Sequence, residues 1–155
     1  MLGKQDESNC EKMVRFGWDM RWSVYIKTWM GQLVYQGDQD YESGGVPRGG
    51  GWGNVRNLLF ENFELEGVSR GPFITQDNGK ANSSAGGTSK MQISDVVFRN
   101  FTGSLKSDSG KLGEISCSRP NPCFDIHFED MNLEAALGTC RWSQPGAIFG
   151  LPGCA

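Results

Sequence analysis

A short pattern occurs three times in the chain, and it constrains the fold more than any other feature. It reads Asx, aliphatic, any residue, Phe, charged, Asx, apolar, and its copies occupy residues 57–63, 95–101 and 125–131. In each copy the second and fourth residues are apolar, which is the period-two spacing of one face of a strand. The second Asx ends this short strand. We expect a bend there, because Asn and Asp tolerate the left-handed backbone conformation and bond to nearby backbone.

The copies are spaced like the coils of a solenoid. They begin 38 and 30 residues apart, and the first two are followed by further short apolar strands at 72–76 and 113–116. Bend, strand, loop and strand in regular succession favour a β-solenoid, whose coils stack on one another. Phe60, Phe98 and Phe128 are then expected to stack in successive coils. A β-sandwich is the alternative, and it is disfavoured because sandwich strands need not repeat an Asx corner.

The glycine content supports an all-β chain. There are 22 Gly in 155 residues, and each costs about 1 kcal/mol relative to Ala inside a helix, which argues against a helix bundle. Two Gly-rich polar segments, 42–54 and 77–89, are expected to be surface loops.

Charge and hydropathy exclude some partners. The net charge is −3 and the pI is about 5.2, which removes the electrostatic argument for nucleic acid or an anionic membrane surface. No apolar run approaches the roughly 20 residues that span a bilayer. The polar start also lacks the apolar region, roughly 7 to 15 residues long, of a secretory signal peptide.

The cysteines point to an oxidising compartment. Cys117 and Cys123 close a small loop, and Cys140 and Cys154 bracket the last segment, so we predict two disulfides. Zinc is the alternative, but the chain holds a single His. Cys10 is left without a predicted partner. Neither a metal nor a cofactor is expected.

From residue 20 onward the sequence resembles the C-terminal half of the fungal polygalacturonases, glycoside hydrolase family 28. The resemblance starts at Ile26-Lys27-Thr28, similar to the family's Arg-Ile-Lys-Thr. It continues in order through NVRNLLFENFEL, GPFITQDN, KMQISDVVFRNFTG and ISCSRPNPCFDIHFEDMNL. It implies that residues 20–155 are the C-terminal coils of a right-handed parallel β-helix truncated on its N-terminal side, with 1–19 unassigned. It further implies inverting hydrolysis of galacturonan or rhamnogalacturonan in plant cell walls, by a complete relative that is extracellular and monomeric and acts on pectic polysaccharide.

The family's catalytic segments are missing from this sequence. The resemblance implies three Asp residues and a Gly-His-Gly segment on coils before the Ile-Lys strand, yet Asn-Thr-Asp, Asp-Asp and Gly-His-Gly do not occur here. His127 is predicted to be a strand residue opposite the apolar face. The other carboxylate groups are interpreted as loop charge or repeat positions: Asp38, Asp40 and Glu42 in a Gly-rich segment, and Asp125, Glu129 and Asp130 in the third copy. No catalytic residue is therefore expected in this chain.

Substrate-binding residues are expected instead. The resemblance gives Lys27 the role of pairing with a uronate carboxylate, although an ordinary exposed strand Lys is the alternative. Tyr25 stands where the motif has Arg, and Asn78 stands where the Gln-x-Tyr strand has Tyr. Both departures favour the rhamnogalacturonan or exo-acting branches, in which Tyr25 stacks on a less charged sugar.

Two N-glycosylation sequons occur, at Asn82 and Asn100. Asn82 lies in a Gly/Ser-rich segment and is the favoured acceptor, whereas Asn100 occupies a predicted corner. For function, the leading hypothesis is part of a secreted pectin hydrolase that lacks its catalytic set. The alternatives are a non-catalytic β-solenoid that binds pectic chains and an inactive remnant.

Overall fold

The computed structural model describes residues 14–16, 20–31, 50–78, 87–106, 110–134, 137–141 and 143–154. Every regular element in these ranges is a β-strand. The strands are β1 (Val14–Phe16), β2 (Tyr25–Trp29), β3 (Gly53–Val55), β4 (Leu58–Val68), β5 (Phe73–Asn78), β6 (Met91–Leu105), β7 (Glu114–Ser116), β8 (Phe124–Leu133), β9 (Thr139–Arg141) and β10 (Ile148–Phe149).

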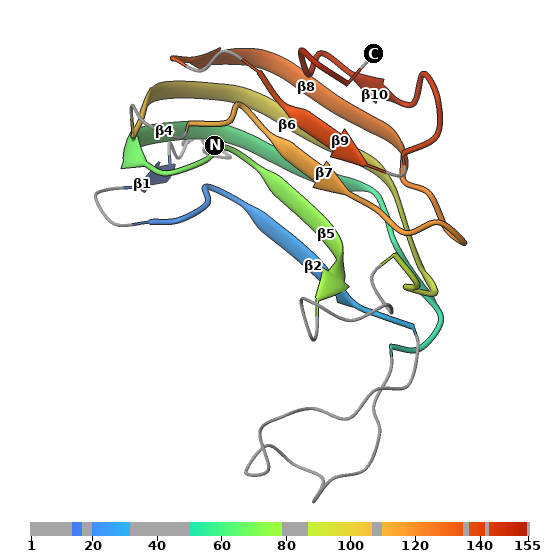
Figure 1. Ribbon diagram of the computed structural model, residues 1–155. Helices are drawn as coiled ribbons and strands as arrows, with labels where there is room; N and C mark the ends of the chain where they lie inside the picture. The colour runs from blue at the N-terminus through green and yellow to red at the C-terminus, as the bar shows by residue number, and fades with distance from the viewer. Residues whose placement is uncertain are drawn as a thin grey trace, which may run out of the picture.

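The strands form two sheets, and the coils of the chain contribute strands to both (Figure 1). Sheet I has the order β1-β4-β6-β8-β10, with β3 also pairing β6, and sheet II has the order β2-β5-β7-β9. All pairings are parallel, and from β4 to β10 the chain alternates between the two sheets. This is the predicted parallel β-helix. Strand β1 lies within the segment 1–19 that has no assignment from sequence, and it extends sheet I by pairing with β4.

The Asx corners are confirmed by the backbone angles. Asn62, Asn100 and Asp130 have φ values of 64°, 53° and 52°, which lie in the left-handed region that these side chains tolerate. The first Asx of each copy, where no bend is predicted from sequence, is also left-handed: φ is 58° at Asn57, 52° at Asp95 and 56° at Asp125. Strands β6 and β8 therefore run through both Asx positions as single bent strands, whereas in the first copy Asn57 separates β3 from β4.

The interior is built from side chains that repeat from coil to coil. The rings of Phe60 and Phe98 lie 5.5 Å apart, and those of Phe98 and Phe128 lie 5.0 Å apart, which confirms the predicted stack. A second stack joins Phe63 and Phe101, with centroids 4.6 Å apart and ring planes at 1°. Offset stacks of this kind add to the stabilisation from apolar burial.

Two disulfides close the last coils. One joins Cys117 to Cys123, with both residues fully buried, and the other joins Cys140 to Cys154. They link the cysteines that are paired in the sequence analysis, while Cys10 lies outside the described residues.

The expectation of a surface loop at 77–89 is wrong at both ends. Residues 77 and 78 continue β5, and Ser89 is 0% exposed. The Ser89 hydroxyl lies 3.1 Å from Thr28 Oγ1, and its carbonyl accepts a bond from Ser118 Oγ at 2.7 Å. Polar residues can be buried here because each finds a partner in the neighbouring coil. The segment 42–54 likewise ends in a strand, because β3 begins at Gly53.

The corner at Asn100 supplies a stability test. Its Nδ2 donates to Asn62 Oδ1 at 2.8 Å, so the side chain bonds across coils while the backbone is left-handed. Asn100→Gly removes the amide but keeps the backbone unstrained, whereas Asn100→Ala removes both advantages. We expect Ala to lower the free energy of unfolding by about 1 kcal/mol more than Gly, measured by urea denaturation. Equal losses in the two variants would show that the left-handed conformation is not maintained.

Candidate functional site

The candidate site is the outer face of sheet II. Along β2, Ile26 points into the core, so its neighbours Tyr25 and Lys27 point outward and are exposed. The parallel register places Phe73 beside Tyr25 and Thr75 beside Lys27. The sequence reasoning about Tyr25 and Lys27 therefore selects two residues that the structure brings onto one face.

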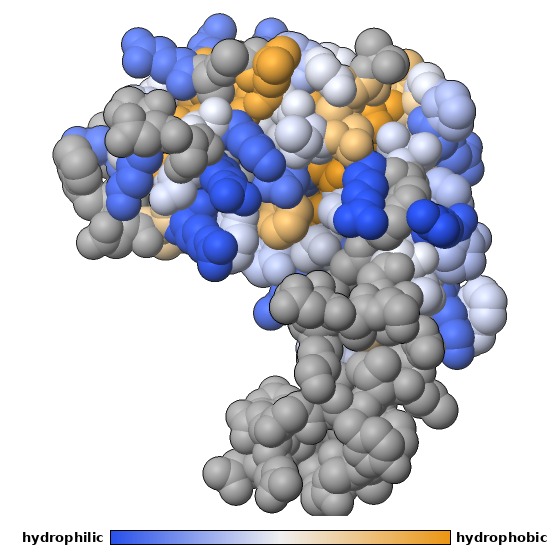
Figure 2. All heavy atoms as spheres, in the orientation of Figure 1, coloured by the Kyte–Doolittle hydropathy of each residue, from blue (hydrophilic) through white to orange (hydrophobic). Residues whose placement is uncertain are grey.

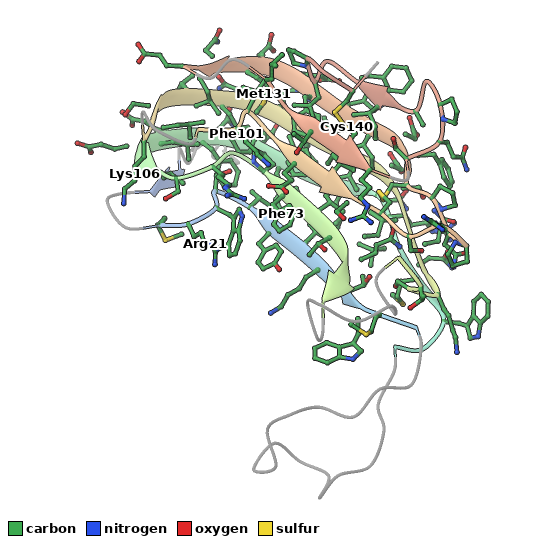
Figure 3. The ribbon with its side chains drawn as sticks, viewed as in Figure 1. Arg21, Phe73, Phe101, Lys106, Met131 and Cys140 are labelled. Atoms are coloured by element: carbon green, nitrogen blue, oxygen red, sulfur yellow. A yellow bond between two sulfur atoms is a disulfide. The ribbon has the colours of Figure 1, made fainter. Side chains whose placement is uncertain are left out.

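Three aromatic rings gather at the start of this face. The centroid of the Tyr25 ring lies 5.1 Å from that of Phe73 and 4.4 Å from that of Trp22. The centroids of Trp22 and Phe73 lie 5.5 Å apart, and the interplanar angles of the three pairs are 8° to 30°. We call Trp22, Tyr25 and Phe73 the aromatic cluster. Figure 3 shows Arg21 and Phe73 on this side of strands β2 and β5.

Two cations contact the aromatic cluster. The guanidinium carbon of Arg21 lies 4.5 Å from the centroid of the Trp22 ring, and Lys27 Nζ lies 5.5 Å from that of Tyr25. Both separations fall within the range of cation–π attraction. Burial raises the pKa of the Tyr25 phenol above its usual 10.0, while the Arg21 charge acts to lower it. Burial is the larger effect, so the net shift of the phenol pKa is upward.

Further along the same face, Glu114 is held between two cations. Its Oε2 lies 2.9 Å from Arg70 Nη1 and 3.3 Å from Lys111 Nζ. The register places Phe73 on one side of Glu114 and Thr139 on the other. Figure 2 shows hydrophilic side chains around a small apolar area over this part of the molecule. Among the side chains that the structure describes, Arg21 and Lys27 add exposed positive charge to this face of a chain whose net charge is −3.

The structure does not bring every predicted residue into this site. For Asn78 it describes the backbone, which pairs with Trp29, and not the side chain. Asn82 lies outside the described residues. Asn100 lies on sheet I, where its amide is used by the corner.

The residues that the sequence analysis excludes as catalytic make contacts away from this face. His127 lies on sheet I, with Nε2 2.8 Å from Asp125 Oδ1 and its ring stacked 4.5 Å from that of Phe149. Glu129 pairs with Arg99 at 2.7 Å, which raises the pKa of that guanidinium. Asp38, Asp40 and Glu42 lie outside the described residues. Within the described ranges no cluster of His, Cys, Asp and Glu suits a metal ion, and no helix is long and apolar enough to span a membrane.

Comparison with known proteins identifies the family. The sequence profile of "Glycosyl hydrolases family 28" matches residues 47–145. The chain belongs to this family. Together with the parallel strands of both sheets, this confirms the β-helix class predicted from the repeat.

The most similar curated relatives in the comparison are fungal. The chain is 45% identical over 150 residues to "Putative galacturan 1,4-alpha-galacturonidase C" of Neosartorya fischeri, an alignment that covers 92% of this chain and 35% of the relative. A protein of the same name in Aspergillus niger is 45% identical over 149 residues, covering 92% of this chain and 34% of the relative. An "Exopolygalacturonase" of Cochliobolus carbonum is 32% identical over 109 residues, covering 68% and 24%. The chain thus spans about a third of the length of these two galacturonidase-named relatives. No solved structure matches it significantly.

Sequence reasoning missed several residues of this family 28 face. An alignment of the expected strands at 72–76 and 113–116 places Glu114 beside Phe73. The position of Glu114 could therefore have been predicted from the sequence. Arg21 and Trp22 precede β2 and belong to no repeat. Their position depends on how the chain enters β2, for which the sequence carries no comparable signal.

Strand β5 is fixed by a buried amide. Gln76 is 0% exposed, its Oε1 accepts from the Ser118 amide at 2.9 Å, and its Nε2 donates to the Met91 carbonyl. These bonds tie β5 to the first residue of β6 and to the segment after β7. The backbone that presents Phe73 and Thr75 is thereby held in place.

This anchoring is testable by substitution. Gln76→Leu removes the partner of the buried Ser118 N–H and of the half-buried Met91 carbonyl, so we expect the free energy of unfolding to fall by about 3 kcal/mol. Gln92→Leu is the matched control. The half-buried Gln92 amide donates to the Pro122 carbonyl at 2.8 Å. Loss of this hydrogen bond should lower the free energy of unfolding by about 1 kcal/mol. Similar losses in the two variants, measured by urea denaturation, would contradict the anchoring role.

Proposed function

We propose that this chain forms part of a pectin-degrading hydrolase that acts from the end of galacturonan chains, and that its share of the work is substrate binding. The observation that carries this is the pairing of Lys27 with Tyr25, the exposed ring of the aromatic cluster on the face of sheet II. A uronate sugar offers an apolar C–H face for aromatic contact and a carboxylate for a cation. The names of the relatives, an exopolygalacturonase and galacturan galacturonidases, support the exo-acting branch.

The chemical step would be inverting hydrolysis. That mechanism uses two carboxyl groups roughly 6.5 to 9.5 Å apart, one as acid and one activating water. The family's catalytic segments do not occur in this sequence. On the described face, Glu114 has its Oε2 engaged by Arg70 and Lys111, so it is poorly placed to exchange a proton with a sugar. The catalytic carboxyl groups therefore belong to coils outside this sequence.

We also propose an extracellular setting. Two disulfides support folding in an oxidising compartment. We assign the glycan to Asn82 rather than Asn100, because the Asn100 amide already donates to Asn62 and attachment of a sugar would displace that bond. The protein would act as a monomer on pectic polysaccharide.

Binding can be tested at Lys27. Lys27→Gln removes the cation while keeping a polar side chain of similar reach, and we expect affinity for oligogalacturonate to fall about tenfold. Isothermal titration calorimetry measures this. The control is Arg56→Gln, which removes an exposed cation from the segment between β3 and β4, away from sheet II. Equal effects of the two substitutions would refute a specific role for Lys27.

A binding solenoid without hydrolysis is the second candidate, and the missing catalytic segments favour it for the chain taken alone. We therefore expect the purified 155-residue chain to bind oligogalacturonate but to release no reducing ends from polygalacturonate or rhamnogalacturonan. Reducing-end assays over long incubation check this. Turnover would show that carboxylates present here perform catalysis. Absence of both binding and turnover would support an inactive remnant.

A further inference from the structure

Two exposed cations contact adjacent rings of one aromatic cluster. Arg21 lies over Trp22 and Lys27 over Tyr25, and the two rings are themselves 4.4 Å apart. Tyr25 is 37% exposed, and Arg21 and Lys27 are exposed as well. Cation, two rings and cation thus follow one another at the β2 edge of sheet II, where Trp22 is half-buried and the other three side chains are exposed.

Replacing a motif Arg by Tyr25 suggests a site with less positive charge, and hence a less charged sugar. The geometry argues otherwise. Arg21 reaches the same cluster from outside the strand, so the charge absent at position 25 is supplied from position 21. The Arg21 charge also acts to lower the pKa of the Tyr25 phenol, against the larger effect of burial.

We propose that Arg21 is a specificity-determining residue that, together with Lys27, recognises a sugar with a free carboxylate lying on Trp22 and Tyr25. The rings contact the apolar face of the pyranose, and the cations bind its carboxylate. An esterified or neutral sugar retains the ring contact but gains nothing from Arg21. This inference rests on the proposed function, because it assumes that the face of sheet II binds a pectic chain.

A structural cation–π contact is the competing account of Arg21, and it predicts no preference between charged and neutral ligands. Two probes separate the accounts: an oligogalacturonate, and the same oligomer with its carboxyl groups reduced to alcohols. Affinities are measured by calorimetry on the full 155-residue chain. The variants are Arg21→Gln, Arg21→Lys, Tyr25→Leu and the control Arg56→Gln.

We expect Arg21→Gln to weaken oligogalacturonate binding about tenfold and to change binding of the reduced oligomer less than about twofold. Arg21→Lys should restore most of the preference, because it restores the charge. Tyr25→Leu should weaken both ligands alike, since the ring contact serves both. Higher salt should narrow the difference between wild type and Arg21→Gln, because it screens exposed charges. Arg56→Gln should change neither affinity.

The outcomes distinguish this inference from the proposed function. If the wild type binds oligogalacturonate and Lys27→Gln weakens it, but Arg21→Gln leaves it unchanged or weakens both ligands equally, only the role of Arg21 is overturned. If the wild type binds neither oligomer, the proposed function fails and this inference fails with it. Unfolding midpoints in urea confirm that each variant is folded. Arg21→Lys provides the test if Arg21→Gln does not fold, because loss of preference with charge retained would overturn the role.

Discussion

Parallel register between coils is the constraint on which the other features of this molecule depend. Each residue of one coil lies beside its equivalent in the next, at the strand spacing of about 4.8 Å. A side chain that suits its neighbour is therefore repeated: Phe60 lies on Phe98 and Phe98 on Phe128, while Asn100 bonds to Asn62. The same rule operates on the outside, where Tyr25 stacks on Phe73. Interior stability and the candidate binding face are consequences of one geometry.

The parts of the fold that repeat could be predicted from sequence. The Phe stack and the corners at Asn62, Asn100 and Asp130 follow from a pattern seen three times, because each copy supports the interpretation of the others. The left-handed residues at the start of each copy were within reach of the same argument. Asn57 lies between β3 and β4, whereas Asp95 and Asp125 lie within β6 and β8, so in all three copies the chain bends at the first Asx as well as at the second.

The parts that occur once were harder to predict. Ser89 lies in a Gly/Ser-rich stretch whose composition indicates an exposed loop, yet Thr28 and Ser118 provide partners that make its burial inexpensive. Those partners lie 61 and 29 residues away in sequence, so no local pattern reveals them. Arg21 is a similar case. Lys27 could be selected because a family motif contains it, whereas the approach of Arg21 to the aromatic cluster depends on the path of the chain before β2.

Net charge alone gives a misleading picture of what this chain can bind. A charge of −3 argues against any polyanion at long range, and that argument applies to a galacturonan as much as to a nucleic acid. At physiological salt, however, exposed charges are screened over about 8 Å, so a ligand at the surface responds mainly to the side chains it touches. At the proposed binding face of sheet II, the exposed cations Arg21 and Lys27 lie beside the aromatic cluster, and Glu114 is paired with Arg70 and Lys111. Recognition of an acidic polymer then has to rely on short-range contacts, and ring stacking beside a cation supplies both affinity and selectivity at that range.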